Sequence, residues 1–72
     1  MTFENYSNWD TFECVNWVLN SEPIKETVLN GNSIEARKAI LSHMTMVKYC
    51  YSPDVELSNI NIQEVIDTVR DI

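Results

Sequence analysis

Glycine occurs once and proline twice among these 72 residues, so the chain is poor in the residues that form tight turns between strands. Only Asn30-Gly31 matches a hairpin-turn dipeptide, and helix signals flank it on both sides. This scarcity disfavours a β-sandwich or a β-barrel. The chain also lacks the glycine-rich loop that binds phosphate groups in nucleotide-binding enzymes.

Long apolar runs and export signals are also missing. No apolar stretch approaches the roughly 20 residues of a membrane-spanning helix. Residues 1–4 resemble neither a signal peptide nor a transit peptide. We therefore expect a cytoplasmic protein without membrane contact. The two cysteines, Cys14 and Cys50, lack metal-ligand spacing, so we expect two free, dispensable thiols in a reducing compartment.

Catalytic motifs are missing as well, because the chain has no nucleophile elbow and no HExxH spacing. The single histidine, His43, precedes Cys50 by two helical turns, or roughly 10 Å of rise, which is too far for a Cys-His pair. We predict no catalytic, cofactor or metal site. Three carboxylates, Glu64, Asp67 and Asp71, share one side of the last predicted helix and are interpreted as a solvated face. A basic partner surface and a weak divalent-cation site are the alternatives.

Positive charge is scarce, with 5 Lys and Arg against 11 Asp and Glu, for a net charge of −6. Residues 1–24 and 52–72 are each acidic, whereas residues 25–51 are basic. We interpret this division as acidic terminal segments packed beside a basic central helix. A negative surface disfavours nucleic acid as a direct ligand, because phosphate neutralisation supplies most of that affinity.

Capping and periodicity signals predict a small single-domain, all-α bundle of about four helices over residues 1–72. The predicted helices span 11–20, 23–30, 33–51 and 62–71, with N-terminal capping sequences at 10–13, 32–35 and 61–64. Short strands over 55–57 or 60–62, where apolar and polar residues alternate, are the alternative.

One cation, Arg37, falls on the apolar side of the third predicted helix, together with Ile40 and Met44. We expect its guanidinium to pair with a carboxylate of an acidic terminal segment. On that basis, Arg37→Ala should cost more stability than Lys38→Ala.

Five of the seven aromatic residues, by contrast, are concentrated in the first 17 positions. Since a small domain needs large side chains in its core, we interpret this cluster of Phe3, Tyr6, Trp9, Phe12 and Trp17 as mainly core. The alternative is a protein-binding surface with an acidic rim, formed by Tyr6, Trp9, Asp10, Glu13 and Trp17.

Phe12 and Trp17 lie about 140° apart around a helix, so both cannot face one core. Phe12 shares a stripe with Val15 and Leu19, and we assign it to the core. Trp17 then either seats an N-terminal arm of Phe3, Tyr6 and Trp9 or meets a partner.

The elements Asn5-Tyr6-x-x-Trp9 and Trp17-x-x-Asn20-Ser21-Glu22 resemble the opening of small uncharacterised bacteriophage proteins, cyanophage proteins among them. The resemblance covers about the first 22 residues, and Ser21 stands where Asp is more usual. It implies a phage protein made in the cytoplasm of an infected bacterium, and it carries over no activity to this chain.

Three functional hypotheses follow. The first is a non-enzymatic phage-type protein that binds a host protein through its acidic, aromatic N-terminal region. The second is an acidic DNA mimic that inhibits a nucleic-acid-binding enzyme, although duplex DNA has a far denser row of charges. The third is a small self-associating structural subunit, because a homodimer would extend a marginal core.

Overall fold

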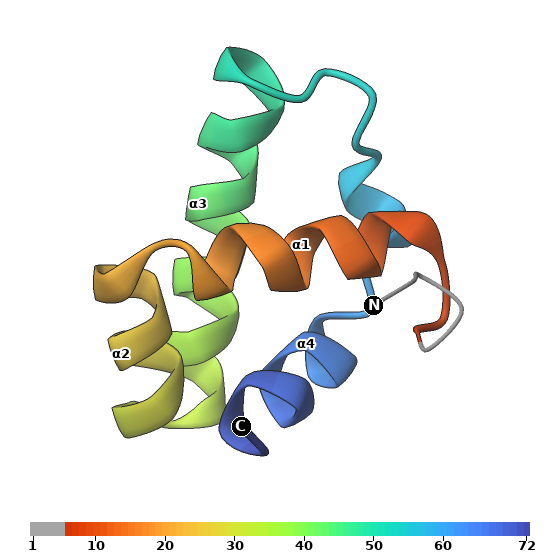
Figure 1. Cartoon of the computed structure of the whole chain (residues 1–72). Helices are drawn as coiled ribbons and strands as arrows, with labels where there is room; N and C mark the ends of the chain where they lie inside the picture. Colours follow the sequence, from red (N-terminus) through yellow and green to blue (C-terminus); the bar gives the residue numbers. More distant parts are fainter. Residues whose placement is uncertain (1–5) are drawn as a thin grey trace.

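The computed structural model describes residues 6–72, and this part of the chain contains four α-helices and no strand (Figure 1). The helices are α1 (Trp9–Leu19), α2 (Glu22–Asn30), α3 (Ser33–Cys50) and α4 (Ile62–Arg70), with a 3-10 turn, η2 (Leu57–Asn59), before α4. The predicted all-α class is confirmed. The alternative strands are wrong, because residues 55–57 and 60–62 belong to irregular chain, η2 and the start of α4.

Asparagine side chains cap the N-termini of three of the helices. The side chains of Asn8, Asn32 and Asn61 accept hydrogen bonds from backbone N–H groups in the first turns of α1, α3 and α4, respectively. The caps at Asn32 and Asn61 were predicted from the sequence. Asp10 was the wrong choice for α1, which begins two residues earlier because Asn8 is its cap.

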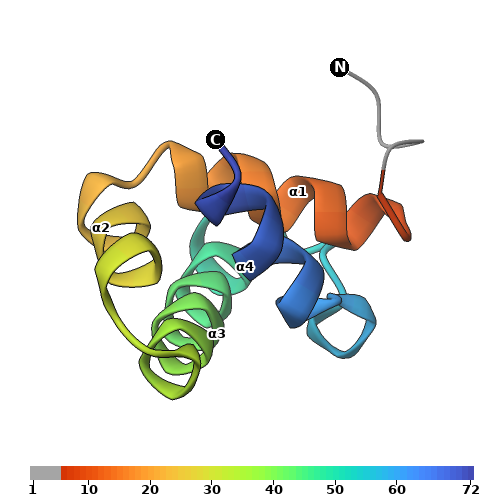
Figure 2. The same ribbon diagram turned by 90° about the horizontal axis from the view of Figure 1, so that it is seen from below.

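Helices α2 and α3 form a pair, and α1 crosses α3 and α4. A short loop joins α2 to α3, and the two helices lie side by side in opposite directions (Figures 1 and 2). Helix α1 runs across α3 and α4, and it leads directly into α2 (Figure 1). The start of α2 and the end of α3 therefore lie near the C-terminal half of α1.

Aliphatic side chains fill the core between these helices. Its largest fully buried members include Ile40, Met44 and Ile66, and no aromatic residue within 6–72 is fully buried. The interpretation of the aromatic cluster as core holds only in part: Tyr6 and Trp17 are partly buried and pack against the core. Phe12 is half-buried and Trp9 is 40% exposed, while Phe3 lies outside the described residues.

Helix α1 turns a different face inward from the one predicted. Its buried side chains are those of Thr11, Cys14, Val15 and Val18, whereas Phe12 is only half-buried. The assignment of Phe12 to the core is therefore wrong. The fully buried Thr11 hydroxyl accepts a hydrogen bond from the backbone N–H of Asn61 at 2.9 Å, which joins the start of α1 to the start of α4.

Arg70 joins the end of α4 to the end of α2. Its Nε donates to the carbonyl of Val28 at 2.9 Å, and its Nη2 donates to the carbonyl of Gly31 at 2.8 Å. Carbonyls in the last turn of a helix have no partner within that helix, so these bonds stabilise the end of α2. The prediction for Arg37 is wrong: its side chain is exposed and forms no ion pair within residues 6–72.

We therefore predict that Arg70→Ala lowers the free energy of unfolding by about 1–3 kcal/mol, because two charge-assisted hydrogen bonds are lost. The matched control is Arg37→Ala, which should change it by less than about 0.5 kcal/mol. Urea unfolding of both variants measures the difference. A larger loss for Arg37→Ala than for Arg70→Ala would contradict the assignment.

Candidate functional site

A hollow of about 390 Å³ opens between the end of α1, the start of α2 and the C-terminal half of α3. Its volume is at the lower end of the range for small-ligand pockets, about 300–1,000 Å³. The side chains that line it belong to Trp17, Asn20, Ser21, Glu22, Pro23, His43, Met46 and Tyr51. We call it the aromatic hollow.

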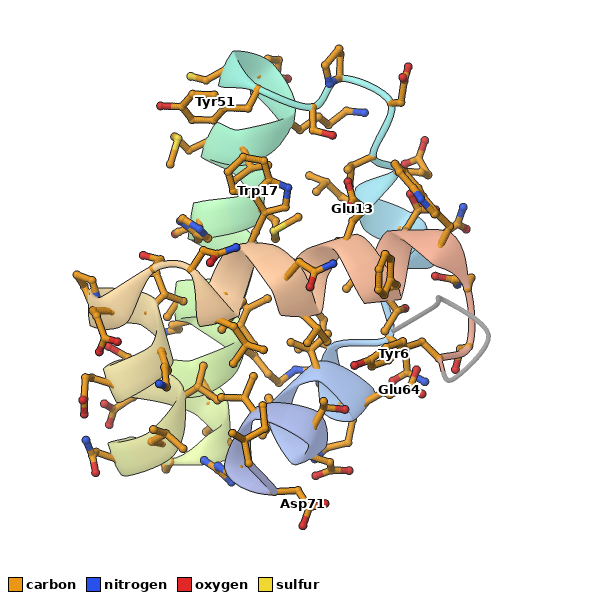
Figure 3. The ribbon with its side chains drawn as sticks, in the orientation of Figure 1. Tyr6, Glu13, Trp17, Tyr51, Glu64 and Asp71 are labelled. Atoms are coloured by element: carbon orange, nitrogen blue, oxygen red, sulfur yellow. The ribbon has the colours of Figure 1, made fainter. Side chains whose placement is uncertain are left out.

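Two stacked aromatic rings form one side of the aromatic hollow. The ring centroids of Trp17 and Tyr51 lie 5.5 Å apart, and the ring planes differ by 24°. Figure 3 shows Trp17 rising from α1 toward Tyr51, which follows the end of α3. Trp17 is partly buried against the core, whereas Tyr51 is 65% exposed. Tyr51 therefore presents aromatic surface that the fold itself does not bury.

His43 adds an unsatisfied polar atom beside these rings. Its Nε2 is shielded from solvent and has no hydrogen-bond partner within the described part of the chain. A buried polar atom without a partner costs about 1–3 kcal/mol, and such atoms are rare in folded proteins. A rearrangement that paired this nitrogen with a bound group would recover part of that free energy.

The five residues predicted to bind a partner do not form one site. Trp9, Glu13 and Trp17 follow one another at four-residue intervals, so they spread over about 80° of the outward side of α1. Trp9 is 40% exposed, and Glu13 is half-buried. These two residues and Trp17 therefore form a continuous outward stripe that ends at the aromatic hollow.

Tyr6 and Asp10 have contacts elsewhere. The Tyr6 ring packs against that of Phe12, with centroids 5.7 Å apart. Asp10 accepts hydrogen bonds from the backbone N–H of Glu56 at 3.0 Å and from Nδ2 of Asn59 at 3.3 Å. Tyr6 therefore covers Phe12, whereas Tyr51 covers Trp17. The hypothesis that an N-terminal arm packs on Trp17 is wrong for Tyr6.

Sequence reasoning missed Tyr51, Met46 and His43 as parts of this site. Met46 is 43% exposed, and it reaches the hollow from the same helix as His43. These residues lie far from Trp17 in the sequence, and no motif connects them. Only the crossing of α1 over α3 brings them together.

Two acidic side chains of α4 accept hydrogen bonds from other groups of the same chain. Glu64 accepts from the backbone N–H of Ser7 at 3.1 Å, near Tyr6 (Figure 3). Asp67 accepts from Nε2 of Gln63 at 3.0 Å. Residues 6–72 contain no group of three or more His, Cys, Asp or Glu residues that could hold a metal ion. The arrangement therefore adds no support to the weak cation site.

The two thiols occupy opposite environments. Cys14 is fully buried, and this burial raises the pKa of its thiol from 9.0 to about 12, so the thiol is protonated at neutral pH. Cys50 is exposed at the end of α3, and both cysteines are free. His43 and Cys50 lie on one continuous helix, two turns apart, so they do not form a nucleophile and base pair.

Comparisons with known proteins add no assignment to this site. No family model, no curated protein and no solved structure matches the chain. Within the described residues, no helix has both the length and the apolar character needed to cross a membrane. The functional assignment therefore depends on the geometry of the molecule.

We predict that a thiol reagent modifies Cys50 rapidly in the native protein and modifies Cys14 only after unfolding, because Cys14 is inaccessible and protonated. Mass spectrometry after a short reaction with iodoacetamide should show one added group. Two rapid additions to the folded chain would contradict this prediction.

Alkaline pH should also act on stability through Cys14. Above about pH 9 the unfolded chain loses this thiol proton while the folded chain retains it, so the free energy of unfolding falls by up to about 1.4 kcal/mol per pH unit until the folded pKa of about 12. Urea unfolding at pH 8 and pH 10 measures this loss. Cys14→Ala is the control, because it removes the titrating group and should show a smaller loss. Equal losses for the two proteins would contradict the account.

Proposed function

We propose that this protein is a non-enzymatic binding domain that takes an apolar side chain of a host protein into the aromatic hollow. The observation that supports it most directly is the 65% exposed Tyr51, stacked on Trp17 at the edge of that hollow. The resemblance of the N-terminal elements to small bacteriophage proteins supports a partner in the cytoplasm of an infected bacterium.

The exposed aromatic and thioether side chains supply the binding free energy in this proposal. Tyr51 and Met46 both remain substantially in water, and the area they lose on binding contributes about 25 cal/mol per Å². Tyrosine and tryptophan are frequent hot-spot residues in interfaces, and methionine adapts its shape to different partners. An interface centred on Tyr51 and Met46 can therefore form without any change in the core.

Acidic groups near the hollow favour a partner in which basic residues surround the apolar side chain that is bound. Glu22 lines the hollow and is paired only weakly with Lys25, at 3.9 Å, with its side chain 73% exposed. Glu13 lies one turn before Trp17 on the outward stripe of α1. A net charge of −6 would also accelerate the approach of a basic surface.

DNA mimicry receives less support from the arrangement of the carboxylates. Asp10, Glu64 and Asp67 accept hydrogen bonds from neighbouring groups of the same chain. A mimic needs carboxylates in a regular outward row at the spacing of phosphates. The aromatic hollow therefore accounts better for the surface that the fold leaves exposed.

The proposal predicts that Tyr51→Ala weakens binding of the host partner at least tenfold, or about 1.4 kcal/mol, while the melting temperature stays near that of the parent. Tyr49→Ala is the matched control. Tyr49 is 82% exposed on the last turn of α3, and it does not line the hollow. Trp17→Ala is a poor probe, since Trp17 also packs against the core.

The measurement is affinity capture from bacterial lysate, followed by titration of the captured protein with each purified variant. The partner should be retained by the parent and by Tyr49→Ala, and it should be lost by Tyr51→Ala and by Met46→Glu. Equal affinity of the parent, Tyr51→Ala and Met46→Glu for every captured protein would overturn the proposal.

A further inference from the structure

Exposed apolar side chains also gather at the opposite end of the α2 and α3 pair from the aromatic hollow. Here α2 ends, α3 begins and α4 ends, as the lower part of Figure 1 shows. Leu29 is 39% exposed, Ile34 is 67% exposed and Ile72 is 75% exposed. We call this region the basal surface. It is distinct from the site of the proposed function.

The basal surface also has the cations that the fold leaves unused. Of the five Lys and Arg residues, Lys25 is near Glu22, while Lys48 and Arg70 donate to backbone carbonyls. Arg37 and Lys38 are exposed, and neither forms an ion pair or hydrogen bond with another residue of 6–72. Both follow Ile34 by one helical turn, so cations and an apolar side chain share one surface.

A hollow with two carboxylates lies at the end of α4. It has a volume of about 540 Å³, and it is lined by Asp67, Thr68, Arg70, Asp71 and Ile72. Figure 3 shows Asp71 at the lower edge of the molecule, directed away from the other helices. The hydrogen bond from Arg70 to Gly31 holds the end of α4 near the start of α3. The carboxylates at the end of α4 and the cations near the start of α3 therefore belong to the same end of the molecule.

We infer that the occupant of the basal surface is a second copy of this chain. A two-fold axis through the surface places Arg37 and Lys38 of each copy against Asp67 and Asp71 of the other. One surface thus provides both halves of a closed, isologous interface. Nucleic acid would meet only the two cations and would be repelled by the rest of a chain of charge −6.

Apolar contact and charge have different roles in this dimer. Exposed ion pairs contribute about 0–1 kcal/mol each, so they fix the orientation, and burial of Leu29, Ile34 and Ile72 supplies most of the association free energy. Repulsion between the two negative molecules is largely screened beyond about 8 Å at physiological salt. A second copy also extends an aliphatic core that is small for an independent domain.

The dimer would present two aromatic hollows, one on each copy and both remote from the shared surface. A host protein with two binding sites, or an oligomeric host protein, would then be bound with an avidity that exceeds the affinity of one hollow.

Paired charge reversals test the arrangement directly. The first variant is Arg37→Glu with Lys38→Glu, and the second is Asp67→Lys with Asp71→Lys. Either variant alone brings like charges together in the dimer, so its association constant should fall at least tenfold. An equimolar mixture should recover dimers, because the reversed regions of the two variants are complementary. Asp54→Lys, an exposed change in the loop after α3, is the control and should dimerise like the parent.

Sedimentation equilibrium up to millimolar concentration measures each case, and circular dichroism confirms that each variant folds. Dimerisation of the parent, weakening in both variants and recovery in the mixture would support the inference. A monomeric parent would overturn it, and so would undiminished dimers of either variant or a mixture that stays monomeric. Loss of dimers would leave binding of a single host protein by Tyr51 unchanged, so the inference and the proposed function can fail separately.

Discussion

The hydrogen bond between the Thr11 hydroxyl and the Asn61 N–H fixes how α1 is turned about its own axis. The Thr11 side chain is fully buried, so its hydroxyl without this partner would cost about 1–3 kcal/mol. With Thr11 directed toward α4, Cys14, Val15 and Val18 follow on the buried face. Trp17 cannot share that face fully, and it emerges beside Tyr51. The aromatic hollow is therefore a consequence of the rotation that this one bond selects.

The division between an aliphatic core and an aromatic exterior follows from the same rotation. Ile40, Met44 and Ile66 fill the space between the helices, and the bulky rings remain at the periphery, where Tyr6 covers Phe12 and Tyr51 covers Trp17. A core of flexible and branched apolar side chains of this size packs closely between short helices. Rings that are not needed for the core are available for recognition, and this availability is the physical basis of the proposed binding function.

Local signals in the sequence were sufficient to locate the helices, but they did not identify which face of a helix is buried. The capping sequences at 32–35 and 61–64 located α3 and α4 to within one residue, because an Asn side chain bonds to backbone only three positions away. In α1, the stripes through Phe12 and through Cys14 are both plausible. The choice depends on Asn61, 50 positions along the chain, and no local pattern encodes it. For the same reason, the sequence did not connect Tyr51 or His43 with Trp17. The arginine that joins two helices is Arg70, which bonds to the carbonyls of Val28 and Gly31, whereas Arg37 is exposed.

The aromatic hollow depends on the outward placement of Trp17 beside Tyr51, and nuclear Overhauser spectroscopy of the native protein measures this placement directly. We expect strong cross-peaks between the indole protons of Trp17 and the ring protons of Tyr51, whose ring centroids are 5.5 Å apart. We also expect cross-peaks between the rings of Tyr6 and Phe12. Cross-peaks that join the Trp17 indole to Tyr6, with none to Tyr51, would contradict this placement.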